Sequence, residues 1–229
     1  MEAHIMESAK ISKTLLKRLP VYLNHLKSLP DSDENISATA IASALGLGHV
    51  LVRKDLAKIS GEGRRRTGRS RVELIQDIEK YLDYTSATTS VVVGSGALGQ
   101  ALLDYGGFEA SGLNVMAGFD LNPMAKQSET GKPIYSMSRL ESFCKCYDVR
   151  IGIIAVPAEN AQMVCDGLVA CGIQAIWNFS PIRLNVPTNV VLQSENFAVS
   201  INTLRMQLRN REELPYGQLS RGIERSSIV

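Results

Sequence analysis

The residues best suited to anion binding form a glycine-rich loop that joins a short apolar run to a helical stretch. The run Val91–Val93 leads into the pattern GxGxxG, formed by Gly94, Ser95, Gly96, Ala97, Leu98 and Gly99. In this pattern the first glycine permits a tight turn, the second lets the backbone approach a pyrophosphate, and the third lets the helix pack close to the strand. The first amides of the helix then face the anion. The loop therefore predicts a dinucleotide site.

A carboxylate at the end of the next apolar run narrows the choice of nucleotide. Asp120 lies 21 residues after Gly99 and directly follows the run Val115–Phe119. An acid at this spacing accepts a hydrogen bond from the ribose 2′-hydroxyl and repels a 2′-phosphate. The predicted cofactor is therefore NAD(H) rather than NADP(H). Two alternatives stay open: a glycine-rich turn that binds nothing, and a site for another nucleotide such as coenzyme A.

A second group of residues is suited to binding a polyanion. The stretch 37–60 has the form of a helix-turn-helix, and the basic segment 61–71 follows where a wing would lie. A helix in the major groove and a basic wing on the phosphates make a coherent DNA-binding unit. Each piece also fits a plainer interpretation, as a corner of a helical bundle and a solvated loop. Residues 49–72 hold eight basic side chains against two acidic ones, the basic ones being Arg53, Lys54, Lys58, Arg64, Arg65, Arg66, Arg69 and Arg71.

Apolar spacing predicts the elements that position these residues, and it changes character near residue 86. Spacing of three and four residues predicts helices over 11–29, after the cap residue Ser37, over 49–59 and over 72–82. In the third helix we expect Val50, Leu51 or Val52, and Leu56 to face the core, with Arg53 and Lys54 exposed. A small polar linker follows at 84–89.

Beyond the linker, short apolar runs alternate with helical stretches, which predicts a parallel sheet with right-handed crossovers. A further helix is expected over Val199–Arg209, and a largely disordered polar tail from Arg211. The predicted fold class is α/β, with an N-terminal winged helix-turn-helix domain and a doubly wound, Rossmann-type parallel sheet. The expected strands are Ser90–Val93, Val115–Phe119, Ile134–Tyr135, Ile151–Val156, Ala175–Asn178 and Val190–Gln193.

The composition excludes several classes of protein. Hydrophobic residues make up 45% and charged residues 21% of the 229, as in an ordinary soluble globular chain. The apolar runs are far shorter than the ~20 residues of a membrane helix, and the N-terminus has no pattern of a secretory signal. Four cysteines without CxxC spacing favour the reducing cytoplasm. Only three histidines are present, which argues against a histidine-rich metal site.

The chain resembles the Rex family of redox-sensing transcriptional repressors over about residues 11–208. The resemblance implies a winged-helix domain at 1–86, a Rossmann domain that binds NAD(H) at 87–195, a helix at 196–210 swapped between the subunits of a homodimer, and a tail at 211–229. It implies that the homodimer binds an AT-rich inverted-repeat operator and releases it when NADH replaces NAD+. The segments that carry it are RLPVYL (18–23), VRKDL (52–56), VVGSGALGQALLDYGGF (92–108), FDLNP (119–123), IGIIAVPAENAQ (151–162) and NFSPIRLNVP (178–187).

The resemblance also implies roles for individual residues. The glycine loop Gly94–Gly99 would hold the pyrophosphate, and Asp120 the adenosine ribose. Pro157 and Ala158, at the carboxyl end of one strand, would face the nicotinamide ribose, and Asn178 would bind the cofactor at the end of the next strand on the same rim. Tyr105 would lie near the nicotinamide, and Phe197 would reach the partner subunit's nicotinamide pocket. The implied DNA contacts are Arg53, Lys54, Lys58, Arg64, Arg65, Arg66 and Arg69.

The chain departs from the family's pattern in the wing and at two amides. Arg66 replaces a glycine of the usual wing and Arg69 a tyrosine, so the wing is more basic. Asn196 stands where many members have an aspartate, and Asn24 where some have an arginine. In those members the acid and the base could pair across the two domains, whereas this chain has an amide side chain at both positions. We therefore expect NADH to release this chain from DNA less effectively.

Two other functions stay open at this stage. An NAD-dependent oxidoreductase would need an acid–base residue beside the nicotinamide. All histidines lie in the first 49 residues, and none of the three lysines after residue 87 lies at the carboxyl rim of the later strands. The other alternative is a DNA-binding module whose nucleotide fold no longer senses. The sequence favours a repressor that is not an enzyme.

Overall fold

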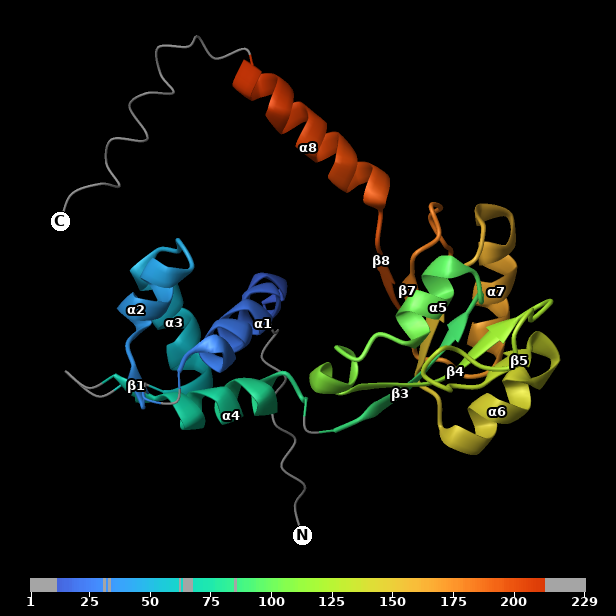
Figure 1. The fold of residues 1–229 in the computed structure, drawn as a ribbon, viewed down its shortest axis with the longest axis horizontal. Helices are drawn as coiled ribbons and strands as arrows, with labels where there is room; N and C mark the ends of the chain where they lie inside the picture. Colours follow the sequence, from blue (N-terminus) through green and yellow to red (C-terminus); the bar gives the residue numbers. More distant parts are fainter. Residues whose placement is uncertain are drawn as a thin grey trace. The chain divides into compact units, whose positions relative to one another are not determined.

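The computed structural model describes residues 12–212, apart from 31, 33, 62, 64–67 and 85. The chain divides into two compact units, one of Met1–Ala87 with Ala110–Gly112, the other of Thr88–Glu109 with Leu113–Val229. The sequence predicts this boundary after residue 86. Figure 1 shows the elements of each unit along the chain. In the part of the chain that is described, no helix combines the length and the apolarity needed to cross a membrane.

The described residues of the N-terminal unit form four helices and a two-stranded antiparallel sheet. Its largest buried side chains include Leu19, Tyr22 and Leu56. The Ser37 side chain accepts a hydrogen bond from the amide of Ala40 at 3.0 Å, which caps the second helix as predicted. The elements are α1 (Lys13–Ser28), β1 (Asn35–Ile36), α2 (Ala38–Ala44), α3 (His49–Ser60), β2 (Arg69–Ser70) and α4 (Arg71–Tyr81).

The orientation of α3 corrects one prediction. The helix buries Val52, Asp55 and Leu56, whereas Val50 and Leu51 are 43% and 39% exposed. Three consecutive apolar residues span about 200° of a helix, so they cannot all face one core. Packing against α1, α2 and α4 selects Val52, and the other two remain on the outer face.

In the C-terminal unit, the residues that the structure describes form a sheet of six parallel strands in the order β5-β4-β3-β6-β7-β8. Numbered from the first strand of the unit, this order is 3-2-1-4-5-6, the arrangement of doubly wound dinucleotide-binding sheets. The order reverses between β3 and β6, so ligands are expected at the carboxyl ends of these two strands. The strands are β3 (Thr88–Val93), β4 (Leu113–Asp120), β5 (Ile134–Ser136), β6 (Ile151–Ile154), β7 (Ala175–Asn178) and β8 (Val191–Ser194).

Helices cover the two faces of this sheet unequally. One core cluster joins Val93 and Phe119 of the sheet to residues of α6 (Leu140–Tyr147) and α7 (Ala158–Ala170). A smaller cluster on the other face joins Val92 and Ile153 to Leu103 of α5 (Ala97–Leu103). Because neighbouring strand residues point to opposite faces, Val92 and Val93 contribute to different clusters. Short 3₁₀ turns occur at η1 (Glu109–Ser111) and η2 (Met137–Arg139).

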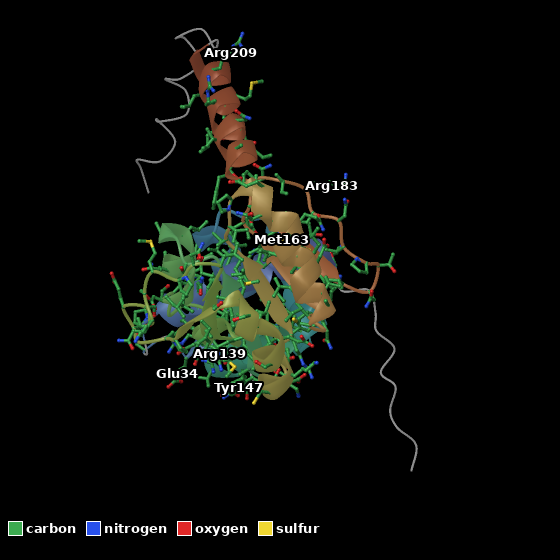
Figure 2. The ribbon with its side chains drawn as sticks, turned by 90° about the vertical axis from the view of Figure 1, so that its right-hand side faces the viewer. Glu34, Arg139, Tyr147, Met163, Arg183 and Arg209 are labelled. Atoms are coloured by element: carbon green, nitrogen blue, oxygen red, sulfur yellow. The ribbon has the colours of Figure 1, made fainter. Side chains whose placement is uncertain are left out.

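The last helix, α8 (Phe197–Glu212), begins before and ends after the predicted span Val199–Arg209. The Asn196 side chain accepts a hydrogen bond from the amide of Ala198 at 3.0 Å and so caps its N-terminus. Side chains project from all sides of α8 in Figure 2, where Arg209 marks its far end. Of the predicted tail 211–229, two residues belong to this helix, and 213–229 lie outside the described residues. The apolar side chains of α8 are all more than half exposed, namely Val199, Ile201, Leu204, Met206 and Leu208.

Candidate functional site

Close packing at the glycine loop requires two of its three glycines. Gly94 has a φ of +105°, and a Cβ there would lie 2.4 Å from the carbonyl oxygen of Ala155, which follows β6. A Cβ on Gly99 would lie 1.8 Å from the carbonyl oxygen of Gly94. The loop is therefore drawn against both the β6 strand end and the first turn of α5. This is the geometry that the glycine pattern predicts.

The middle glycine has a different surrounding. A Cβ on Gly96 would meet no atom within 4 Å, and its backbone is extended at φ −67° and ψ −178°. Gly96 directly precedes α5, whose first amides are free of intrahelical partners. The open space beside Gly96 thus fits a pyrophosphate that approaches the backbone at a helix N-terminus. Ser95, Ala97 and Leu98 complete the loop, with Leu98 exposed.

Asp120 lies beside this loop and is hydrogen-bonded to it. The amide and the hydroxyl of Ser95 donate to Asp120 Oδ2 at 2.7 and 2.8 Å, and the amide of Asn122 donates to Oδ1 at 2.9 Å. Partial desolvation raises the pKa of Asp120, but these donors outweigh it and hold the pKa below its ordinary value. The carboxylate is therefore ionised at neutral pH and is held beside the glycine loop.

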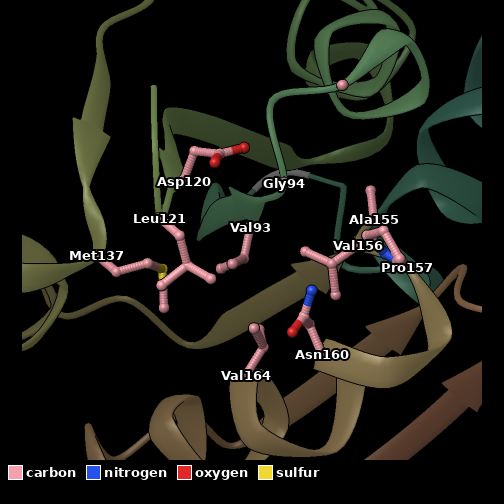
Figure 3. A pocket seen from close by; sticks show the side chains of 11 residues that line it. Val93, Gly94, Asp120, Leu121, Met137, Ala155, Val156, Pro157, Asn160 and Val164 are labelled. Carbon is pink, nitrogen blue, oxygen red and sulfur yellow. The ribbon is translucent and has the colours of Figure 1, made fainter. Parts of the chain in front are cut away.

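A cavity of about 270 Å³ opens between the glycine loop and the end of β6. In Figure 3, Asp120, Leu121 and Met137 line one side of it, and Val156 and Asn160 line the other. Asp120 and the glycines are among the predicted site residues, whereas the apolar lining and Asn160 are not. Leu121 directly follows β4 and Asn160 lies in the first turn of α7, so their positions after strand ends were the available signal.

The predicted site residues at the carboxyl ends of β6 and β7 differ in their exposure and in their hydrogen bonds. Pro157 lines the cavity and is exposed, and Ala158 begins α7. Asn178 is fully buried, and its side chain is held by the backbone of its own loop. Its Oδ1 accepts from the amide of Ser180 at 2.9 Å, and its Nδ2 donates to the carbonyl of Ile182 at 2.9 Å. Asn178 therefore positions the rim rather than presenting its amide to a ligand, which differs from the contact role expected.

Five aromatic rings form a row on the α5 face of the sheet. Consecutive ring centroids are 4.9, 5.5, 4.9 and 6.4 Å apart. Both ends of the row are exposed, Tyr105 by 58% and Phe197 by 56%. The indole of Trp177 donates to Glu195 Oε1 at 3.1 Å, which fixes the middle of the row. The row comprises Tyr105, Phe108, Trp177, Phe179 and Phe197. It places Phe197 beside Phe179 of its own chain, whereas the resemblance implies that Phe197 reaches the partner subunit's nicotinamide pocket.

The outer face of α3 in the N-terminal unit is positively charged. Arg53 and Lys54 are exposed, as predicted, and so is Lys58. The helix contains one acidic residue, Asp55, and this side chain is only 4% exposed. Because no carboxylate of α3 itself lies among the exposed cations, the face is suited to a polyanion.

A buried ion pair holds α3 in this orientation. Arg18 on α1 donates to both carboxylate oxygens of Asp55, at 2.7 and 2.9 Å. The Tyr22 hydroxyl donates to the same carboxylate at 2.9 Å. Burial and this hydrogen bond raise the pKa of Tyr22 to about 12. The sequence analysis misses this triad, which fixes how α3 presents its cations.

The predicted wing is only partly described. β1 and β2 pair in antiparallel register, Asn35 with Ser70 and Ile36 with Arg69. Arg69 donates through Nε to the Ser60 hydroxyl at 2.9 Å and through Nη2 to the Gly61 carbonyl, so its guanidinium is bound to the end of α3. This contact gives Arg69 a role in holding the wing that the expected DNA contact does not include. Arg64, Arg65 and Arg66 lie outside the described residues.

Two family models match the chain. One, for a putative DNA-binding protein N-terminus, matches residues 10–57, and the other, for a CoA binding domain, matches residues 85–182. A curated relative, the redox-sensing transcriptional repressor Rex of Porphyromonas gingivalis, is 38% identical over 202 residues. This alignment covers 86% of this chain and 93% of the relative.

Two solved structures of RSP, a Rex-family repressor, are similar to nearly the whole chain. RSP in complex with β-NAD+ and operator DNA has 31% identity and a TM-score of 0.81, with 95% of this chain and 99% of that chain covered. RSP in complex with β-NADH has 32% identity and a TM-score of 0.76, with 89% and 96% covered. The similarity therefore spans both units, each with its own candidate site.

Proposed function

The chain belongs to the Rex family of redox-sensing transcriptional repressors, and we propose that its own residues divide that function between the two units. It is a repressor and not an enzyme. The N-terminal unit binds operator DNA, and the C-terminal unit binds NAD(H). The observation that carries this assignment is the carboxylate of Asp120, which is hydrogen-bonded to the glycine loop beside an open cavity.

The C-terminal site accounts for the choice of NAD(H). The open backbone at Gly96 accommodates the pyrophosphate, and ionised Asp120 accepts from the ribose 2′-hydroxyl. The same carboxylate repels the 2′-phosphate of NADPH. Leu121, Met137 and Val156 supply apolar walls for the rest of the adenosine half.

The N-terminal unit supplies the DNA contacts. Arg53 and Lys54 lie in the N-terminal half of α3, and the N-terminal residues of a recognition helix are those that contact base edges in the major groove. Lys58, Arg64, Arg65 and Arg66 add charge for the phosphates, which fixes orientation on the duplex without reading sequence. Arg69 supports this surface through its bonds to the end of α3.

Assembly as a homodimer explains the exposed face of α8. We assign residues 1–86 to DNA binding, 87–195 to NAD(H) binding and 196–210 to a helix exchanged between subunits. Every apolar side chain of α8 is exposed in the single chain, so burial against a second copy is the simplest way to cover them. An inverted-repeat, AT-rich operator matches the two-fold symmetry of such a dimer. The cysteines are free, in keeping with a cytoplasmic protein.

The exposure of Tyr105 and Phe197, the two ends of the aromatic row, supports a switch that distinguishes the two forms of the cofactor. The oxidised nicotinamide ring is positively charged and the reduced ring is uncharged. An apolar pocket between Tyr105 and a partner's aromatic residue favours the uncharged ring, so NADH stabilises the arrangement that releases DNA. Asn196 caps α8 instead of supplying a carboxylate to the other domain, and Asn24 is exposed on α1. We therefore expect NADH to release the operator, but less completely than in relatives with the acidic residue.

A gel-shift titration tests the proposal. The full-length chain is bound to an AT-rich inverted-repeat duplex, and NADH, NAD+, NADPH and coenzyme A are added in turn. Release by NADH, with much weaker effects of the other three, supports the assignment. Emission of Trp177, the sole tryptophan, reports NADH binding independently of DNA. NADH binding without any release contradicts the switch, and equal affinity for NADH and NADPH contradicts the role of Asp120.

A further inference from the structure

The outer face of α3 carries apolar side chains as well as cations. Val50 is 43% exposed and Leu51 39% exposed, whereas Val52 and Leu56 of the same helix are 0% exposed. Isolated exposed apolar residues are common on protein surfaces and need no function. These two differ because they lie in the first turn of the helix that is proposed to enter the major groove.

The spacing of these residues places them among the cations. On a helix, residues three and four positions apart are neighbours. Val50 therefore lies next to Arg53 and Lys54, and Leu51 lies next to Lys54. All four side chains are exposed, and the one carboxylate of α3, Asp55, is turned inward and bonded to Arg18. The exposed face is thus a mixture of positive and apolar side chains with no acidic group of its own.

The major groove of DNA contains groups that bind both kinds of side chain, the positive and the apolar. In the major groove an arginine side chain bonds to guanine O6 and N7, and an apolar side chain contacts the 5-methyl group of thymine. A surface helix that faced only water would gain nothing from Val50 and Leu51. Against a groove that contains thymine, each side chain buries a methyl group together with its own apolar surface.

We propose that Val50 and Leu51 read thymine methyl groups next to the base pair that Arg53 reads. This inference rests on the proposed DNA-binding function and extends it to sequence choice. It predicts that each half-site carries thymine at one or two positions beside a guanine. Removal of one such methyl group weakens binding about fourfold, the fold-change that corresponds to about 0.8 kcal/mol for one buried methyl group.

Replacement of thymine by deoxyuridine tests the proposal because it removes only the 5-methyl group. The full-length chain first selects duplexes from a randomised library, and each thymine of the selected half-site is then replaced singly by deoxyuridine. We expect one or two positions at which the replacement weakens binding about fourfold. Val50→Ala or Leu51→Ala should abolish the difference between thymine and deoxyuridine at one of these positions.

Two control variants distinguish the possible outcomes. Val21→Ala removes a similarly exposed valine from α1, 47% exposed, and should keep the difference between thymine and deoxyuridine. Lys58→Ala should weaken binding to both duplexes equally, since a phosphate contact carries no sequence information. Deoxyuridine without effect at every position, in a chain that does select a sequence, overturns this inference alone. A chain that selects no duplex overturns the proposed function together with it.

Discussion

The candidate site of one unit is formed by main-chain atoms, and that of the other unit by long side chains. The candidate nucleotide site in the C-terminal unit is formed largely by the main chain of glycines. There is no room for a Cβ at Gly94 or Gly99, and the space beside Gly96 is open. The DNA surface in the N-terminal unit is made by long side chains that stand on α3, and a buried ion pair to α1 fixes its orientation. The first kind of site is sensitive to any added atom, and the second to the loss of its support.

The largest effect is expected where an added methyl group would overlap the main chain. Gly99→Ala places a Cβ 1.8 Å from the carbonyl oxygen of Gly94, so α5 and the loop must separate. We expect the free energy of unfolding of the C-terminal unit to fall by about 3 kcal/mol, and NADH affinity to fall at least tenfold. Urea denaturation and Trp177 emission measure the two effects.

Gly106→Ala is the matched control for this substitution, because a Cβ at Gly106 would meet nothing within 4 Å. It should leave stability and NADH affinity close to those of the unmodified chain. Equal behaviour of the two variants would show that close packing does not shape the loop.

The second prediction removes the support of the DNA surface and leaves its cations in place. Asp55→Ala deletes the acceptor of Arg18 and Tyr22, so a partly buried guanidinium loses its partner. Breaking a fully buried pair costs about 3–5 kcal/mol. Because the Arg18 side chain is 23% exposed, we expect about 2 kcal/mol here. Operator affinity should fall although Arg53 and Lys54 are unchanged; unchanged affinity in a gel shift would show that the ion pair does not orient α3.

The third prediction separates binding from folding within the glycine loop. Gly96→Ala adds a Cβ to open space in a backbone conformation that alanine adopts. Stability should change by no more than about 0.5 kcal/mol, whereas NADH affinity should fall about tenfold because the methyl group occupies the space of the pyrophosphate. Calorimetric titration with NADH, with thermal unfolding in its absence, measures both quantities. Normal affinity would place the pyrophosphate elsewhere.

The smallest effect concerns the hydroxyl of Tyr22 and depends on pH. Tyr22→Phe removes one hydrogen bond to Asp55, so we expect a loss of about 1 kcal/mol at neutral pH. The pKa of Tyr22 is raised to about 12 in the folded chain. Its stabilising contribution is therefore complete below about pH 10, the value in an unfolded chain, and declines as the pH rises toward 12. The two proteins should converge in urea denaturation over this interval, and a constant difference would contradict the assignment.

The same contrast explains how far the sequence predicts the molecule. The strand Ala175–Asn178 and the close packing at Gly94 and Gly99 agree with the predictions, because a buried strand and a tight turn impose local patterns on the sequence. The side-chain arrangement of α3 could not be predicted in this way, since Arg18, the partner of Asp55, lies 37 residues earlier in the chain.

Other differences have the same origin in packing and loop structure. The run from Val50 to Val52 does not indicate which residue faces the core until α3 is packed. Asn178 has a side chain that could contact a ligand, yet its amide is hydrogen-bonded to the backbone of its own loop. The apolar lining of the cavity, such as Met137, comes from a connection that carries no motif. The roles of the individual site residues in binding NAD(H) and DNA stay predictions.

The exposure of α8 has a consequence for how the protein forms. An isolated helix of 16 residues is marginally stable in water, because few packing contacts offset the cost of ordering it. Val199, Leu204 and Leu208 are exposed among the residues that the structure describes. In the homodimer proposed above, helix formation at the C-terminus would be coupled to association, so its rate would depend on how often two chains meet. A newly made chain at low abundance would complete its two folded units first and acquire this last helix only as copies accumulate, which makes the amount of repressor a determinant of its own maturation.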